Sequence, residues 1–108
     1  MSIREISEGR QEQGTEEEIT YTLTVDSTWG TPTGTPTVKA YSYDAPTGVY
    51  TDVTSTVIPA GSASVASQVI TLPEIKLLTI GTIYRVEVLF STSEGDTKEA
   101  YAWIDCVR

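Results

Sequence analysis

The chain has 108 residues, which is enough for one domain with a single hydrophobic core. Its formal charge is −8 with only seven Lys and Arg residues, so it lacks the clustered positive charge with which proteins bind nucleic acid. It contains no histidine and one cysteine, Cys106, which excludes the commonest general base, the commonest metal ligand and an internal disulfide.

The chain opens with a polar, Glu-rich segment whose large apolar side chains are Met1, Ile3 and Ile6. Such a segment buries little, so we predict an acidic, flexible leader over residues 1–17, either mobile or loosely docked at a sheet edge. A short strand over Ile3–Ile6 and ordering of the leader on a neighbouring molecule are the alternatives. The leader has no apolar stretch typical of a signal peptide or membrane span, so we expect synthesis in the cytoplasm and no membrane partner.

Alternating apolar residues predict β-strands through the remaining domain, residues 18–108. In the first strand, Ile19 to Val25, apolar residues alternate with Thr, and the same face continues to Trp29. A loop rich in Pro and Gly is predicted over residues 31–36. The later predicted strands cover residues 37–43, 49–57, 67–72, 83–90 and 98–107. Six or seven short strands without a helical period predict an all-β, antiparallel β-sandwich.

The period-two pattern also predicts which side chains point into the sandwich. The predicted inner faces carry Ile19, Tyr21, Leu23, Val25, Val38, Ala40, Ile70, Leu72, Tyr84, Val86, Val88 and Phe90. The last strand is ambiguous, because its odd-numbered face carries both acids and aromatics. We expect the even-numbered face to point inward, with Cys106 as a small buried side chain. The other register, which would bury Trp103, stays open.

Residues 77–90 have a pattern typical of a tyrosine corner, in which a Tyr begins a strand just after a turn. A Leu, a Gly and a Tyr follow at intervals of three residues: Leu78, Gly81 and Tyr84. In such a corner the tyrosine hydroxyl bonds to the main chain. We expect its partner near Ile80 or Gly81.

Taken together, these features resemble the sequence pattern of a known family. Trp29 precedes a loop with Pro and Gly and then a Tyr-bearing strand, and the corner continues in period two through Val86 and Val88. The pattern, over about residues 19–107, resembles fibronectin type III and related immunoglobulin-like domains. The resemblance implies an immunoglobulin-like (fibronectin type III-like) antiparallel β-sandwich. The acidic leader departs from the family pattern.

A narrower resemblance concerns small immunoglobulin-like proteins of tailed phages and prophages. It rests on three segments: Asp52-Val53-Thr54-Ser55-Thr56-Val57, Val69-Ile70-Thr71-Leu72-Pro73 and the Leu-x-x-Gly-x-x-Tyr-Arg series at 78–85. Such proteins occur in head, neck, tail or baseplate gene neighbourhoods. The resemblance implies a structural or decorating virion component without catalysis.

Four aromatic residues are expected on one outer face: Tyr41, Tyr43, Tyr101 and Trp103. In an immunoglobulin-like strand order they would flank the face of Arg85, and aromatic residues concentrate at interface hot spots. We therefore predict a contact patch for a protein partner, including another copy of the chain in a homo-oligomer or virion. The alternative is a carbohydrate-binding module in which these rings stack on sugars.

The residues that could support catalysis or metal binding are carboxylates in or near predicted loops: Asp44, Asp52, Glu94, Asp96 and Asp105. Nothing in the sequence brings two of them together in a cleft, as a glycosidase would need. Glu94 and Asp96 could supply two calcium ligands, although a solvated turn is the favoured interpretation. No glycine-rich phosphate loop is present. We expect no enzymatic activity, cofactor or metal.

Overall fold

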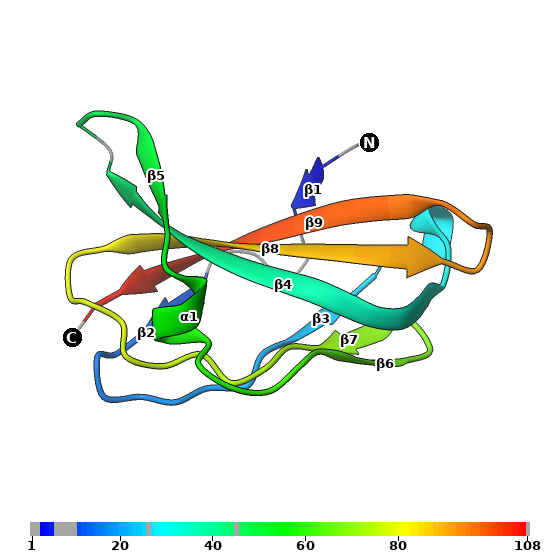
Figure 1. Cartoon of the computed structure of the whole chain (residues 1–108), viewed down its shortest axis with the longest axis horizontal. Helices are drawn as coiled ribbons and strands as arrows, with labels where there is room; N and C mark the ends of the chain where they lie inside the picture. The colour runs from blue at the N-terminus through cyan, green and yellow to red at the C-terminus, as the bar shows by residue number, and fades with distance from the viewer. Residues whose placement is uncertain (1–2, 6–10, 26, 45, 108) are drawn as a thin grey trace.

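The structure is a computed structural model that describes residues 3–5, 11–25, 27–44 and 46–107. Within these residues the chain forms two β-sheets that face each other, an all-β sandwich (Figure 1). The predicted fold class is therefore confirmed at the level of a β-sandwich.

The larger sheet has the strand order β1-β9-β8-β4-β5, and β2 also pairs with β9. Its strands are β1 (Ile3–Glu5), β2 (Gln11–Gln13), β4 (Pro32–Asp44), β5 (Val49–Asp52), β8 (Ile83–Thr92) and β9 (Thr97–Cys106). Strands β5, β4, β8 and β9 are antiparallel neighbours, whereas β1 and β2 run parallel to β9. Figure 1 shows the β4–β5 hairpin projecting away from the body of the sandwich at the upper left.

The smaller sheet has the order β3-β7-β6 and is entirely antiparallel. Its strands are β3 (Thr22–Thr24), β6 (Ser64–Ala66) and β7 (Val69–Thr71). Two short helical turns complete the elements: a 3₁₀ turn, η1 (Ser27–Trp29), and α1 (Thr54–Val57). An isolated bridge between Ile19 and Ile75 continues the pairing beyond β3.

The core lies between the two sheets and follows the predicted faces closely. Most predicted inner residues are buried: Leu23, Val25, Ala40, Ile70, Leu72, Tyr84, Val86, Val88 and Phe90. Tyr21 and Val38 are half-buried and pack against this core, while Ile19 is half-buried at the bridge. The alternation succeeds because one face of each sheet meets the other sheet and the second face meets solvent.

The last strand takes the expected register. Its even-numbered side chains, Ala100, Ala102, Ile104 and Cys106, are all buried. Tyr101 and Trp103 consequently lie on the outer face of the larger sheet and are half-buried there. The prediction that the acids on the odd-numbered face would keep that face outside is confirmed.

The predicted loop over residues 31–36 is wrong, because β4 already begins at Pro32. Its pairing with β8 shifts register between Thr33 and Thr37, which marks a bulge. Gly34 within it has a φ of 72°. A bulge leaves some backbone groups out of the ladder, so prolines and a left-handed glycine are tolerated inside one long strand.

The predicted strand over residues 49–57 is also wrong beyond Asp52, where the chain turns into α1. The Asp52 carboxylate accepts hydrogen bonds from the main-chain N–H and the hydroxyl of Thr54, at 2.9 and 2.7 Å. The Thr54 hydroxyl oxygen in turn accepts from the Ala40 N–H at 2.9 Å. These local side-chain bonds compete with the strand preference of the Val- and Thr-rich sequence.

The predicted strand over residues 67–72 corresponds to β7, and a tight turn joins β7 to a preceding strand, β6, that was not predicted. Ser67 in that turn has a φ of 53°. Serine is not the residue that normally marks a left-handed turn position, so the sequence did not reveal this hairpin.

The N-terminal segment differs from the predicted leader in one respect. Gln11–Gln13 pairs with Ile104, Asp105 and Cys106 of β9, and the Gln13 side chain is fully buried. This part of residues 1–17 therefore belongs to the larger sheet, as in the docked alternative. The backbone of Ile3–Glu5 also pairs with β9, while Met1, Ser2 and residues 6–10 lie outside the described residues.

Candidate functional site

The outer face of the larger sheet carries the most distinctive group of side chains in the described part of the chain. Strand register places Arg85 directly between Tyr41 of β4 and Trp103 of β9. The same register places Tyr43 opposite Tyr50 of β5. Because residues directly opposite each other share a face, these side chains all project away from the smaller sheet.

Tyr101 of β9 lies on the same face, two residues before Trp103. We call the five aromatic residues of this face the aromatic cluster: Tyr41, Tyr43, Tyr50, Tyr101 and Trp103. Their rings contact one another across strands. The Tyr43 and Tyr50 centroids are 4.9 Å apart, and those of Tyr43 and Trp103 are 5.9 Å apart. Tyr101 meets Trp103 edge-on, at 6.3 Å and 85°. Tyr41 meets Tyr50 likewise, at 6.5 Å and 87°. The rings therefore hold one another in place before any partner arrives.

Arg85 forms the centre of the cluster. Its guanidinium carbon lies 4.2 Å from the centroid of the Tyr101 ring, 5.7 Å from that of Trp103 and 5.9 Å from that of Tyr50. These are cation–π distances. Arg85 Nε also lies 2.9 Å from Glu87 Oε2, an ion pair without the angles of a hydrogen bond. The Arg85 side chain is only 18% exposed. It is thus a fixed part of the surface rather than a free, mobile charge.

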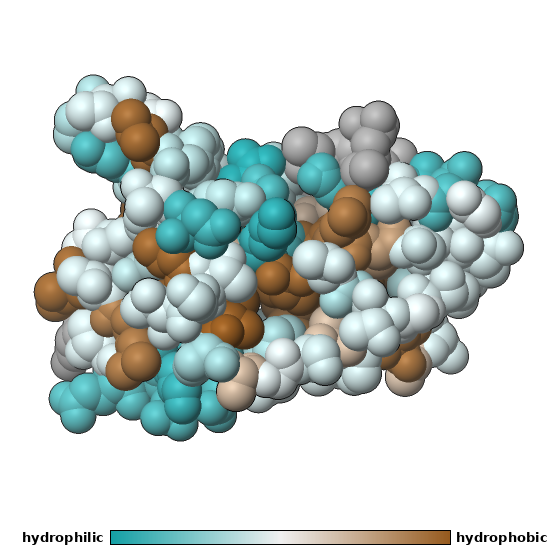
Figure 2. All heavy atoms as spheres, viewed as in Figure 1, coloured by the Kyte–Doolittle hydropathy of each residue, from teal (hydrophilic) through white to brown (hydrophobic). Residues whose placement is uncertain are grey.

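Tyr50 is the member of the cluster that sequence reasoning missed. It is 44% exposed and belongs to β5, which forms the start of the strand predicted over residues 49–57. The available signal was the Pro46-Thr47-Gly48 sequence before β5, which is typical of a turn between paired strands; the pairing of β5 with β4 places Tyr50 opposite Tyr43. In Figure 2 the β4–β5 hairpin forms a separate lobe at the upper left, beside the outer side of the larger sheet.

Two shallow depressions lie on this outer face. One, of about 260 Å³, is lined by Tyr41, Tyr50, Arg85 and Glu87. The other, of about 210 Å³, lies further along the sheet, where Lys39, Glu87, Leu89 and Glu99 join Thr37 and Tyr41 in its lining. The face therefore combines an aromatic region with mixed charges at its border. Such a surface suits contact with another macromolecule better than enclosure of a small molecule.

The tyrosine corner residues occupy the turn that leads into β8. Tyr84 is buried, and its hydroxyl oxygen accepts a hydrogen bond of 2.8 Å from the main-chain N–H of Thr79. The partner thus lies one residue before the expected Ile80 or Gly81. Leu78 is buried in the core, and Gly81 has a φ of 79° and donates its N–H to the Cys106 carbonyl. This group stabilises the fold.

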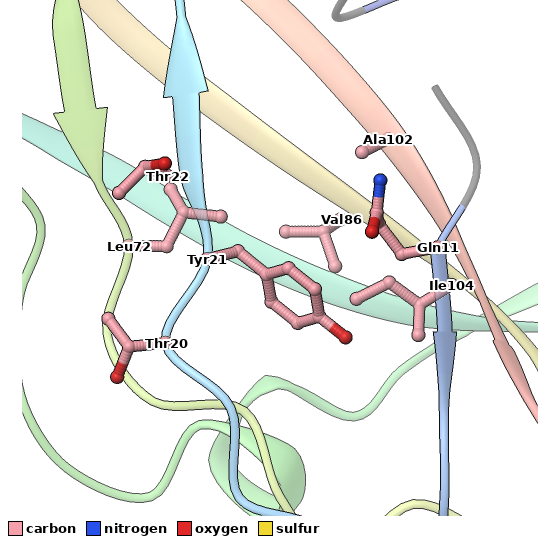
Figure 3. A pocket seen from close by; sticks show the side chains of 8 residues that line it. All are labelled: Gln11, Thr20, Tyr21, Thr22, Leu72, Val86, Ala102 and Ile104. Carbon is pink, nitrogen blue, oxygen red and sulfur yellow. The ribbon is translucent and has the colours of Figure 1, made fainter. Parts of the chain in front are cut away.

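A larger pocket, of about 280 Å³, opens at one side between the two sheets. Figure 3 shows Tyr21 reaching across it from the smaller sheet toward Gln11 and Ile104 of the larger one. Its apolar wall is formed by Leu72, Val86, Ala102 and Ile104, and its polar lining by Gln11, Thr20 and Thr22.

Gln13, two residues after Gln11 on β2, forms hydrogen bonds with three separate parts of the chain: Glu17, Tyr21 and Ile75. Its Nε2 donates to the carbonyls of Glu17 and Ile75, at 2.9 and 2.7 Å. Its Oε1 accepts from the Tyr21 hydroxyl at 2.8 Å. Burial, together with the nearby charge of Glu17, raises the pKa of Tyr21 to about 12. Gln13 was missed because a glutamine in a polar segment carries no signal of burial.

Among the residues that the structure describes, no group of side chains is suited to hold a metal ion. No cluster of three or more acidic or cysteine side chains with metal-binding geometry occurs there. Glu94 and Asp96 lie exposed in the turn between β8 and β9. Cys106 is buried as a free thiol. Neither short helix of the described chain is long and apolar enough to cross a membrane.

Comparison with known proteins adds no family to this description. The sequence matches no protein-family model and has no significant match among curated proteins.

Proposed function

We propose that this chain is a non-catalytic structural domain that binds another protein through its aromatic cluster. The observation that carries the proposal is the position of five contacting aromatic rings and Arg85 on the solvent side of a sheet whose other side already forms the core. Tyr, Trp and Arg are the residue types that dominate binding energy at protein interfaces.

Preorganisation favours binding by this surface. A partner that contacts Tyr50 or Trp103 meets side chains already restrained by neighbouring rings and by Arg85. Little side-chain entropy is then lost on association, which is a main cost of forming an interface.

The ring geometry favours a protein partner over the alternative, a carbohydrate. Sugar stacking requires flat, accessible ring faces arranged in a strip. Tyr50 is tilted by only 37° from Tyr43 and 32° from Trp103. Tyr101 and Trp103, however, stand at 85° and Tyr43 and Trp103 at 66°, so the five rings do not form one flat strip. The guanidinium of Arg85 also lies over the Tyr101 ring. Carbohydrate binding is therefore the second candidate, and the experiment below separates the two.

We infer an immunoglobulin-like sandwich of a phage or prophage virion as the setting for this contact. One support is the sequence resemblance. The others are the division of the strands into two sheets, with β3, β6 and β7 in one and β4, β8 and β9 in the other, and the hydrogen bond between Thr79 and Tyr84. In that setting the chain would decorate or connect virion parts. The fold does not by itself define this role, so the setting rests on analogy.

The test is a capture experiment with matched surface variants. Immobilised wild-type protein, Trp103→Ala and Ile80→Ser are exposed to lysate of the source cells, and the bound proteins are quantified by mass spectrometry. Ile80 is 61% exposed and lies outside the aromatic cluster, so its variant controls for loss of surface apolar area. We expect a protein that wild type and Ile80→Ser retain and Trp103→Ala loses.

A glycan array with the same three proteins tests the carbohydrate alternative. Binding to a glycan that Trp103→Ala abolishes would contradict the proposal in favour of a carbohydrate-binding module. Equal capture of every protein by wild type and Trp103→Ala would contradict the role of the aromatic cluster itself.

A further inference from the structure

We propose that two copies of the chain join through the free edges of their β5 strands. The two strands would run antiparallel about a two-fold axis at Thr51, so that the larger sheets continue into one another. This inference rests on backbone geometry at the sheet edge and not on the aromatic cluster, so it stands or falls separately from the proposed function.

The two edges of the larger sheet are treated differently. At one edge β9 is covered by β1 and β2. At the other edge β5 is the last strand, and no described residue pairs with its outer side. Every residue of β5 is exposed, including Val49 at 54% and Tyr50 at 44%. An exposed edge strand without Pro, Lys or a bulge can pair with another strand.

The hydrogen-bonding groups at this edge belong to Tyr50 and Asp52. The N–H of Val53 donates to the carbonyl of Ala40 on β4, at 2.9 Å. Because N–H and C=O groups of antiparallel strands alternate in direction, the groups of Thr51 also point toward β4. Those of Tyr50 and Asp52 then point away from the sheet, toward an added strand.

These directions restrict how two β5 strands can pair. A residue whose backbone N–H and C=O point away from β4 can form hydrogen bonds only with a residue of the second copy whose groups point outward in the same way. Tyr50 therefore faces either Tyr50 or Asp52 of the second copy. With Tyr50 opposite Asp52, both outward residues of each strand form hydrogen bonds. With Tyr50 opposite Tyr50, Asp52 would face Gly48, whose N–H already donates to Asp44. The register with Tyr50 opposite Asp52 therefore pairs more of the backbone hydrogen-bonding groups at the edge.

The favoured register is also compatible with the side chains. It places Thr51 directly opposite Thr51 of the second copy, a pairing that is favourable in antiparallel sheets. Asp52 lies opposite Tyr50, so the two Asp52 carboxylates do not face each other. The strand is thus self-complementary, as a two-fold interface must be.

Charge sets the conditions under which this pairing is observed. Each copy carries a formal charge of −8, so two copies repel at low salt. Salt screens that repulsion, because the Debye length falls from about 10 Å at 0.1 M to about 3 Å at 1 M. The short contact predicts a weak, concentration-dependent dimer that strengthens with salt. A basic strand from a different protein at the same edge would show the opposite salt dependence.

Analytical ultracentrifugation of the full chain tests the association. We expect wild-type protein to dimerise at high concentration, and more strongly at about 0.5 M than at about 0.05 M salt. Thr51→Lys places two like charges opposite each other and should weaken dimerisation about tenfold or more. Thr35→Lys makes the same change at an exposed position of β4 outside the β5 edge and should dimerise as wild type does.

Disulfide cross-linking tests the register. Residues opposite each other in a non-hydrogen-bonded pair have Cα atoms about 4.5 Å apart, which lies within the range that a disulfide spans. Under mild oxidation Thr51→Cys should form a covalent dimer much faster than Thr35→Cys. The native Cys106 is buried in both proteins, so it should not contribute to cross-linking. A strictly monomeric wild-type protein would overturn the proposal. A dimer unaffected by Thr51→Lys, or equal cross-linking of the two Cys variants, would overturn it as well.

Discussion

The main-chain N–H of Thr79 donates a hydrogen bond of 2.8 Å to the hydroxyl oxygen of Tyr84, five residues further along the chain. This bond ties the turn before β8 to the first buried side chain of that strand. Tyr84→Phe removes the bond and leaves the ring in the core, so it should lower the free energy of unfolding by about 0.5–1.5 kcal/mol. The urea midpoint of the variant measures the effect, with the fold retained by circular dichroism. An unchanged midpoint would show that this bond does not stabilise the corner.

Gln13 should matter more than its place in a polar N-terminal segment suggests. Gln13→Leu removes the hydrogen bonds of Gln13 to the Ile75 carbonyl and the Tyr21 hydroxyl in a region that is largely buried, although the Ile75 carbonyl still accepts from the Ile19 N–H. We expect a loss of about 2–3 kcal/mol in the free energy of unfolding, measured by urea denaturation. Glu12→Leu is the matched control, because Glu12 is exposed on the same strand. A similar small loss in both variants would show that β2 is dispensable for stability.

Stability should fall at alkaline pH because of Tyr21. Its pKa is raised to about 12 in the folded state, from 10.0 as the ordinary value. The unfolded chain therefore loses this proton first, and the stabilisation present below about pH 10 is lost as the pH rises toward 12. Urea midpoints of wild type and Tyr21→Phe between these pH values measure the difference. A difference that stays constant over this range would contradict the raised pKa.

Truncation of a side chain to Ala should reduce the stability of the domain more on the inner face of the larger sheet than on its outer face. Phe90 is 2% exposed in the core, so Phe90→Ala should cost about 3–5 kcal/mol in the free energy of unfolding. Trp103 is half-buried on the outer face, and Trp103→Ala should cost only about 1–2 kcal/mol, mainly through lost ring contacts. Chemical denaturation of both variants tests this order. A larger loss at Trp103 than at Phe90 would mean that the aromatic cluster is part of the structural core.

The strand faces could be predicted from sequence because burial on one side of a sheet imposes a period of two. Val86, Val88 and Phe90 follow it without interruption, and in β9 the acids Glu99 and Asp105 identified the outer face. The bulge after Thr33 and the turn at Thr54 could not be predicted in the same way. Both depend on competition between local hydrogen bonds and strand pairing, which residue preferences alone do not decide.

The candidate site was predictable only in part for a related reason. Tyr41 and Tyr43 could be placed beside Tyr101 and Trp103 once strand order was assumed. Tyr50 joins them through the pairing of β5 with β4, and Arg85 gains its aromatic surroundings from three strands at once. Contacts between residues distant in sequence arise from the completed sheet and leave no local pattern.

The most direct test of the account is the affinity of the aromatic cluster for the protein it captures. Isothermal titration of that purified partner should give at least about tenfold weaker binding for Trp103→Ala than for wild type, as expected for an interface hot spot. Ile80→Ser should bind as wild type does. Equal affinities for wild type and Trp103→Ala, with both proteins folded, would contradict the assignment of this outer face as the binding surface.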